Sequence, residues 1–121
     1  MANPNIVDVT SIYGKTVQAA LDTTLTTEIL LCASDKVLKI NTILIANIDG
    51  TNAADVSVFI TKSGGSPIAI ASTISVPADA TLNLIDKNSS FYLEEGDNIE
   101  AGASADDDLT ITISYEEIDD A

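Results

Sequence analysis

The sequence predicts an all-β domain: an antiparallel β-sandwich or jelly-roll-like domain of about eight strands, with an extended N-terminal arm. The chain contains 16 Ile, 7 Val and 13 Thr among 121 residues, and these β-branched residues favour strands over helices. Short strand-like runs alternate with turn residues about every ten positions, a spacing typical of sandwiches and barrels. With no Trp and only two Phe, the core must consist mainly of Ile, Val, Leu and Ala.

The expected elements fall into three regions. Residues 1–16 are largely polar, contain Pro4 and Gly14 and lack a clean period, which predicts an extended arm. Residues 17–118 form the β-sandwich domain, and residues 119–121 form an acidic tail. Within the domain we expect strands at 17–21, 27–33, 38–48, 54–61, 68–76, 81–84, 99–103 and 109–117.

Two of these strands are the most clearly patterned. In 109–117 the residues Leu109, Ile111, Ile113 and Tyr115 alternate with polar side chains, which predicts a strand with one buried face. Segment 38–48 is the longest, and its residues 43–45 are apolar on both faces. A strand of that kind is expected in the middle of a sheet.

Turn residues separate the apolar runs at 49–52, 63–67, 77–80 and 95–98. Residues 16–31 could alternatively form a helix with Val17, Ala20, Leu21 and Leu25 on one side. Four threonines inside that segment, at 23, 24, 26 and 27, argue against the helix because threonine is a weak helix former.

The charge balance narrows the possible partners. Five Lys+Arg stand against 19 Asp+Glu, giving a net charge of −14, whereas binding to a phosphate backbone requires clustered cations. We therefore expect no nucleic-acid partner. No apolar run is long enough to span a bilayer and the N-terminus lacks a signal-peptide pattern, so we expect no membrane partner and synthesis in a cytoplasm.

Few residues are suited to chemistry. The absence of His and the single Cys argue against zinc sites and the common catalytic triads. Glu94, Glu95, Asp97 and Glu100 could supply paired carboxylates, but a chain with 4% aromatic residues can hardly line a substrate cleft. We expect no enzyme activity, no catalytic residue, no cofactor and no small-molecule substrate. Cys32 lies in an apolar run and is expected to be a small buried hydrophobe.

Asp106, Asp107 and Asp108 are weak candidates for a Ca²⁺ site, because Ca²⁺ binds carboxylate and carbonyl oxygens. Consecutive side chains in an extended loop point in different directions, and the EF-hand spacing is absent. A solvated turn between two strands is the simpler interpretation of these three residues.

Five segments, which together cover most of the chain in order, carry a resemblance. They are NPNIVDVTSIYGKT at 3–16, KINTILIAN at 39–47, IASTISVPADATL at 70–82, YLEEGDNI at 92–99 and SYEEI at 114–118. In these segments the chain resembles small virion structural proteins of tailed phages, especially those of marine bacteria.

The resemblance implies a non-enzymatic virion protein, which we expect to be a capsid decoration (cement) protein on the head surface that bridges capsid subunits. The alternative is a tail-fibre or knob module that binds a host-surface receptor, and a third possibility is a Ca²⁺-dependent binding module. The resemblance also implies synthesis in the cytoplasm of a bacterial host. The expected partners are the major capsid protein or other virion proteins and further copies of the chain. The arm residues expected to make these contacts are Asn3, Pro4, Ile6, Val7, Val9, Ile12 and Tyr13.

Overall fold

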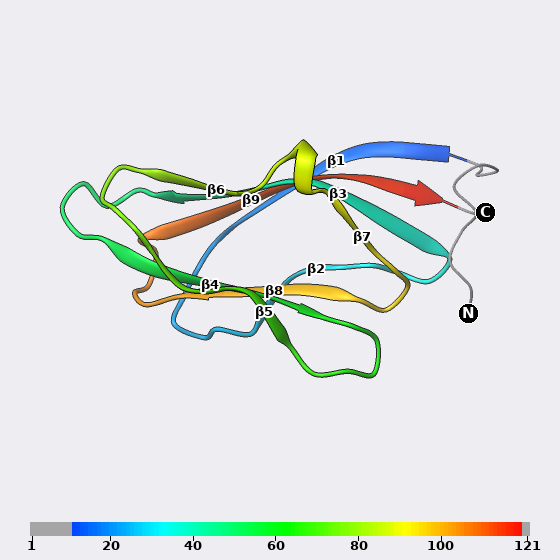
Figure 1. Ribbon diagram of the computed structural model, residues 1–121, viewed down its shortest axis with the longest axis horizontal. Helices are drawn as coiled ribbons and strands as arrows, with labels where there is room; N and C mark the ends of the chain where they lie inside the picture. The colour runs from blue at the N-terminus through cyan, green and yellow to red at the C-terminus, as the bar shows by residue number, and fades with distance from the viewer. Residues whose placement is uncertain (1–10, 120–121) are drawn as a thin grey trace.

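The computed structural model describes residues 11–119, which form nine strands and one 3₁₀ turn (Figure 1). The elements are β1 (Ser11–Ala20), β2 (Thr27–Leu31), β3 (Lys36–Asn47), β4 (Ala54–Thr61), β5 (Ile68–Val76), β6 (Thr81–Ile85), η1 (Lys87–Ser89), β7 (Phe91–Leu93), β8 (Asn98–Ala103) and β9 (Leu109–Asp119). The predicted all-β class is confirmed. The described part of the chain contains no helix with the length and hydrophobicity that crossing a bilayer requires.

Two antiparallel sheets pack face to face. Sheet A has the order β1-β9-β3-β6, with β7 also paired to β3, and sheet B has the order β2-β8-β4-β5. The pairs are nested: β1 pairs with β9, β2 with β8, β3 with β6 and β7, and β4 with β5. The chain is thus one long antiparallel hairpin with its tip between β4 and β5, rolled into two sheets, which is the jelly roll.

The core lies between the two sheets and consists of aliphatic side chains, as expected. On the central strands Ile43 lies opposite Ile113 and Ile45 opposite Ile111, and all four side chains are fully buried. The expectation that segment 38–48 lies mid-sheet is confirmed, because β3 lies between β9 and the pair β6 and β7. A register shift between residues 40 and 42 keeps Ile40 in the core with Ile43.

All eight expected strands are present, but the first one begins earlier than expected. β1 starts at Ser11 rather than at residue 17, and Ser11–Thr16 pair in continuous register with β9 from Asp119 to Ser114. The boundary of the arm at residue 16 is therefore wrong. Most of β1 is exposed, so its sequence lacks the alternation that marks a half-buried strand. Residues 1–10 lie outside the described residues.

Two smaller differences concern β7 and the C-terminal tail. The three-residue strand β7, whose Leu93 is fully buried, was not predicted. The argument against a helix at residues 16–31 is confirmed, because that segment contains the end of β1, a loop and β2. The tail was expected from residue 119, but β9 extends through Asp119, which pairs with Lys36, and residues 120–121 lie outside the described part.

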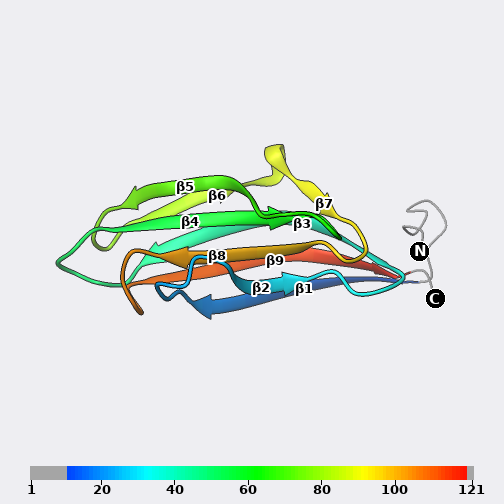
Figure 2. The same ribbon diagram turned by 90° about the horizontal axis from the view of Figure 1, so that it is seen from below.

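The loops gather at the two ends of the sandwich (Figures 1 and 2). At one end, here called the distal end, lie loops 21–26, 48–53, 77–80 and 104–108, held together by backbone hydrogen bonds such as Ile48 N to Asp108 O at 2.9 Å and Asp107 N to Leu21 O at 3.0 Å. At the opposite end, here called the terminal end, lie loops 32–35, 62–67 and 94–97, beside the start of β1 and the end of β9.

Candidate interaction surface

The predicted arm contacts are only partly within the described residues. Ile12 and Tyr13 belong to β1, and their side chains are 56% and 51% exposed. Ile12 lies opposite Ile118 and Tyr13 opposite Glu117 on β9. Asn3, Pro4, Ile6, Val7 and Val9 lie outside the described residues. The two described candidates are exposed apolar side chains on an edge strand, a position from which they can contact a partner.

The outer face of sheet A is free of charge in the three rows of residues nearest the distal end. The strand register aligns outward-facing residues from β1, β9, β3 and β6 into three rows. From the distal end these rows are Ala20, Thr110, Ala46 and Thr81; then Gln18, Thr112, Leu44 and Asn83; then Thr16, Ser114 and Thr42. We call these eleven residues the neutral face. A fifth of the residues in the chain are charged, yet none of the eleven is.

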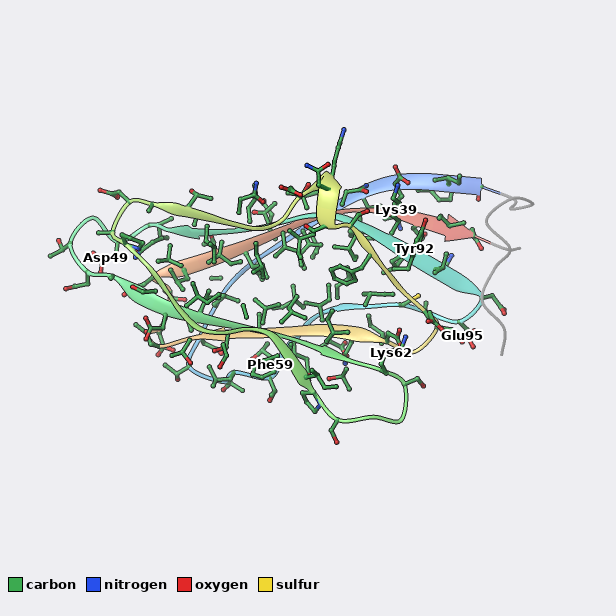
Figure 3. The ribbon with its side chains drawn as sticks, in the orientation of Figure 1. Lys39, Asp49, Phe59, Lys62, Tyr92 and Glu95 are labelled. Carbon is green, nitrogen blue, oxygen red and sulfur yellow. The ribbon has the colours of Figure 1, made fainter. Side chains whose placement is uncertain are left out.

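The neutral face has a defined boundary and a slight hollow. Toward the terminal end, the next row is Tyr92, Lys39 and Glu116, where charge reappears (Figure 3). A shallow depression is lined by β1 and β9, and within it the Gln18 side-chain amide donates to the Thr112 hydroxyl at 3.2 Å. The face thus offers hydroxyl and methyl groups but no ionised group.

The outer face of sheet B is acidic by contrast. Glu28 on β2 lies directly opposite Glu100 on β8, an arrangement of like charges that destabilises a strand pair. Hydrogen bonds from Asn98 to Glu28 at 3.0 Å and from Thr61 to Glu100 at 2.8 Å hold the two carboxylates. By the strand register, Asp55 lies outward on β4, on the same side as Phe59. The two broad faces of the molecule therefore differ in charge.

The two ends of the molecule also differ in charge: lysines occur at the terminal end, whereas the described distal loops have none. At the terminal end Lys15 pairs with Glu117 at 3.1 Å, and Lys36 pairs with Asp119 at 3.0 Å and with Glu117 at 3.6 Å. The four described loops of the distal end contain six aspartates and no lysine: Asp22, Asp49, Asp79, Asp106, Asp107 and Asp108. Hydrogen bonds, first from the Thr51 backbone N–H and then from the Asn52 side chain, lower the pKa of Asp49.

The three weak Ca²⁺ candidates are spread over a turn. The Asp106 carboxylate accepts from the Thr23 backbone N–H at 3.1 Å, and Asp107 has a φ of 63°, which fits a tight turn. Among residues 11–119 no group of three or more metal-ligating side chains comes together. In the described residues these aspartates serve the turn between β8 and β9.

Cys32 is buried, as expected, with its side chain 1% exposed. Its Sγ donates to the Lys36 carbonyl oxygen at 3.2 Å. Burial, and then the nearby Asp97 carboxylate, raise the pKa of this thiol to about 11, so it is almost entirely protonated at neutral pH. Such a thiol is a poor nucleophile.

The neutral face could not be predicted from the sequence, because four strands from different parts of the chain form it. Only one of them gave a clear signal, the alternation of Thr110, Thr112 and Ser114 with core residues along β9. The other three strands become its neighbours only through the jelly-roll topology. No protein-family model matches the chain, and no protein of curated function shows significant similarity to it. The strand pairing defines the chain as a small jelly-roll β-sandwich.

Proposed function

We propose that the chain is a non-enzymatic structural protein of a tailed-phage virion: a decoration protein that binds the outside of the head and bridges capsid subunits. The observation that carries this proposal is the neutral face on a chain of net charge −14. A surface without ionised groups can be covered by another protein without the cost of desolvating unpaired charges. Depletion of charge is also characteristic of the buried centre of protein interfaces.

The outer face of sheet B supports an arrangement in which the neutral face lies on the capsid. A molecule lying on a capsid by the neutral face presents the outer face of sheet B to the solvent, with Asp55, Glu28 and Glu100. An acidic exterior repels other particles of the same kind and keeps them soluble. Weak contacts repeated over a lattice add up through avidity, so each neutral face need contribute only modestly.

The fold supports the proposal by analogy. Jelly rolls occur in viral coat domains and in lectins, and one fold serves many functions. The resemblance in segments 3–16, 39–47, 70–82, 92–99 and 114–118 supports the virion among these uses. Ile12 is exposed and lies on the same side of β1 as Thr16, Gln18 and Ala20, so it supplies further apolar contact area. Tyr13 is exposed on the other side of that strand.

Quantitative mass spectrometry of purified particles of the encoding phage tests the proposal. Hundreds of copies per particle are expected for a lattice-wide decoration protein. A few to a few dozen copies would instead favour the tail-fibre or knob module that binds a host receptor. Absence of the chain from the particle would overturn any virion role.

Attachment to particles that lack the protein tests the surface itself. Thr112→Asp places a charge at the centre of the neutral face and is expected to weaken attachment at least about tenfold, because a buried unpaired carboxylate is costly. Ala69→Asp, at an exposed position opposite Phe59 on sheet B, adds the same charge and should leave attachment unchanged. Equal loss in both variants would show that total charge, rather than this face, governs binding.

The arm is tested by deletion of residues 2–10. A deletion through residue 16 would remove half of β1 and would confuse loss of fold with loss of contact. The shorter deletion is expected to leave the melting temperature nearly unchanged and to weaken attachment. Unchanged attachment would exclude a contact role for Asn3, Pro4, Ile6, Val7 and Val9.

A further inference from the structure

The exposed edges of β-sheets are sites where further strands can add, and proteins usually block them with short strands, bulges, charges or prolines. The described residues contain four sheet edges, two in each sheet: β1 on one side of sheet A and β6 with β7 on the other, and β2 and β5 in sheet B. Three of the four carry such blocking features.

In sheet B, β2 has five residues and a register shift, and β5 has two register shifts and the positive φ of 53° at Thr73. In sheet A, β6 has five residues and a register shift, and the 3₁₀ turn η1 separates it from β7. A regular partner strand cannot follow these edges over a useful length.

The remaining edge, β1, is regular. It runs for ten residues, pairs with β9 without any register shift and contains no proline. Its one charged residue is Lys15, whose ammonium nitrogen forms an ion pair with a carboxylate oxygen of Glu117 at 3.1 Å. Within the described residues β1 pairs with β9 alone, and it forms the lower rim of the molecule in Figure 2. The backbone groups on its outer side are therefore placed to bond another strand.

We propose that two copies of the chain pair through β1, antiparallel about a two-fold axis at Thr16, so that sheet A continues from one copy into the other. A contact of this kind uses the same strand twice and needs no other partner. Because each copy has a net charge of −14, the copies repel one another over most of their surfaces. The β1 edge carries no acidic residue and avoids that repulsion.

The side chains select the register. Directly opposed residues in an antiparallel pair share one face of the sheet. The two-fold axis must therefore lie where one residue is opposite its own copy, and not where two consecutive residues are opposite each other. An axis at Lys15 would place two ammonium groups opposite each other, which is unfavourable. An axis at Thr16 pairs residues 12–20 of both copies, with Thr16 facing Thr16, Lys15 facing Val17 and Ile12 facing Ala20.

The pairing also joins two surfaces already described. Thr16, Gln18 and Ala20 form the β1 margin of the neutral face, so the two neutral faces become one continuous uncharged surface across the axis. The inference itself rests on the strand edges and charges and does not depend on the proposed virion role. It is tested on the purified chain.

Sedimentation equilibrium of the purified chain over a range of concentrations is expected to show a monomer–dimer equilibrium. The dimer should strengthen as NaCl is raised, because salt screens the repulsion between the acidic copies. Thr16→Asp, at an exposed position, places two carboxylates face to face and should weaken dimerisation at least about tenfold. Ala69→Asp, which adds the same charge at an exposed position on sheet B, should dimerise like the wild type. A wild-type chain that stays monomeric throughout overturns the proposal.

Disulfide cross-linking tests the register. Opposed residues of an antiparallel pair have Cα atoms about 4.5–5.5 Å apart, within the range a disulfide spans. Thr16→Cys should therefore form a covalent dimer on mild oxidation, whereas Thr112→Cys should not, because the pairing places its two copies three strand spacings apart. A dimer that fails to cross-link through Thr16→Cys, or that cross-links equally through Thr112→Cys, overturns the β1 pairing. Particle copy number has no bearing on either result.

Discussion

The Asp97 carboxylate lies 2.5 Å from the Lys62 ammonium group and joins the two loops at the terminal end of the sandwich. Its side chain is 2% exposed, whereas that of Lys62 is 55% exposed. One carboxylate oxygen accepts from Ser63 N at 3.0 Å, and the other accepts from Glu94 N at 2.9 Å as well as from Lys62. The loop after β4 is thereby fastened to the loop before β8.

Asp97→Asn should destabilise the protein by about 2 kcal/mol, because hydrogen bonds to a charged acceptor are replaced by weaker ones and an amide N–H₂ faces the Lys62 donor. Urea unfolding measures the change. Lys87→Ala, in the exposed turn η1, alters the net charge by the same amount in the opposite direction and should change stability by less than about 0.5 kcal/mol. An Asp97→Asn variant as stable as the wild type would show that the two loops are held by packing alone.

The same carboxylate should make stability depend on pH in the acid range. Burial by itself would raise the pKa of Asp97, but hydrogen bonds from Lys62, Ser63 and Glu94 outweigh burial and hold that pKa below its ordinary value. The folded state therefore binds fewer protons than the unfolded state, in which the pKa is about 3.9. The contribution of Asp97 is complete above that pH and is lost as the pH falls toward the lower, folded-state pKa.

Urea titrations of wild type and Asp97→Asn at several pH values measure this contribution. The stability difference between them should be constant near neutrality and shrink as the pH falls below about 4. Taking the difference removes the effect of the other carboxylates, including Asp49, whose pKa is also lowered. A difference that stays constant down to pH 2–3 would mean that Asp97 titrates normally in the folded chain.

Ile113→Asp should unfold the domain. Ile113 is fully buried opposite Ile43, so the variant places an unpaired charge in the core at a cost of about 4 kcal/mol or more. Thr112→Asp, the adjacent residue on the outer face of the same strand, is the matched control and should melt within a few degrees of wild type. Circular dichroism on heating compares them, and a cooperative, unshifted melt for Ile113→Asp would contradict the core assignment.

Gly102→Ala should destabilise the chain by about 1–3 kcal/mol through overpacking. A Cβ at Gly102 would lie 2.4 Å from Leu25 Cα and 2.5 Å from the Thr24 carbonyl oxygen, so the backbone of the loop between β1 and β2 would have to move. Gly14→Ala is the control, since a Cβ there would meet nothing within 4 Å. Equal melting temperatures for the two variants would show that this loop yields without cost.

The accuracy of the sequence prediction followed the degree of burial. The alternation in 109–117 and the apolar segment 38–48 predicted the two central strands of sheet A, because each buries at least one face. The sequence predicts an arm at residues 11–16 because an exposed edge strand needs no alternation. β7 was missed because three residues are too few to display a period.

By itself, the sequence determined the all-β class, the aliphatic core, the burial of Cys32 and the acidic character of the chain, because composition and local periodicity suffice for these properties. Only the tertiary structure decided which outward-facing residues become neighbours. Residues of β1, β3, β6 and β9 form the neutral face. The edge of β1 is identified as unblocked only by comparison with the other sheet edges. Surfaces assembled from distant strands depend on topology and register, which the long-range pairing of the folded chain fixes.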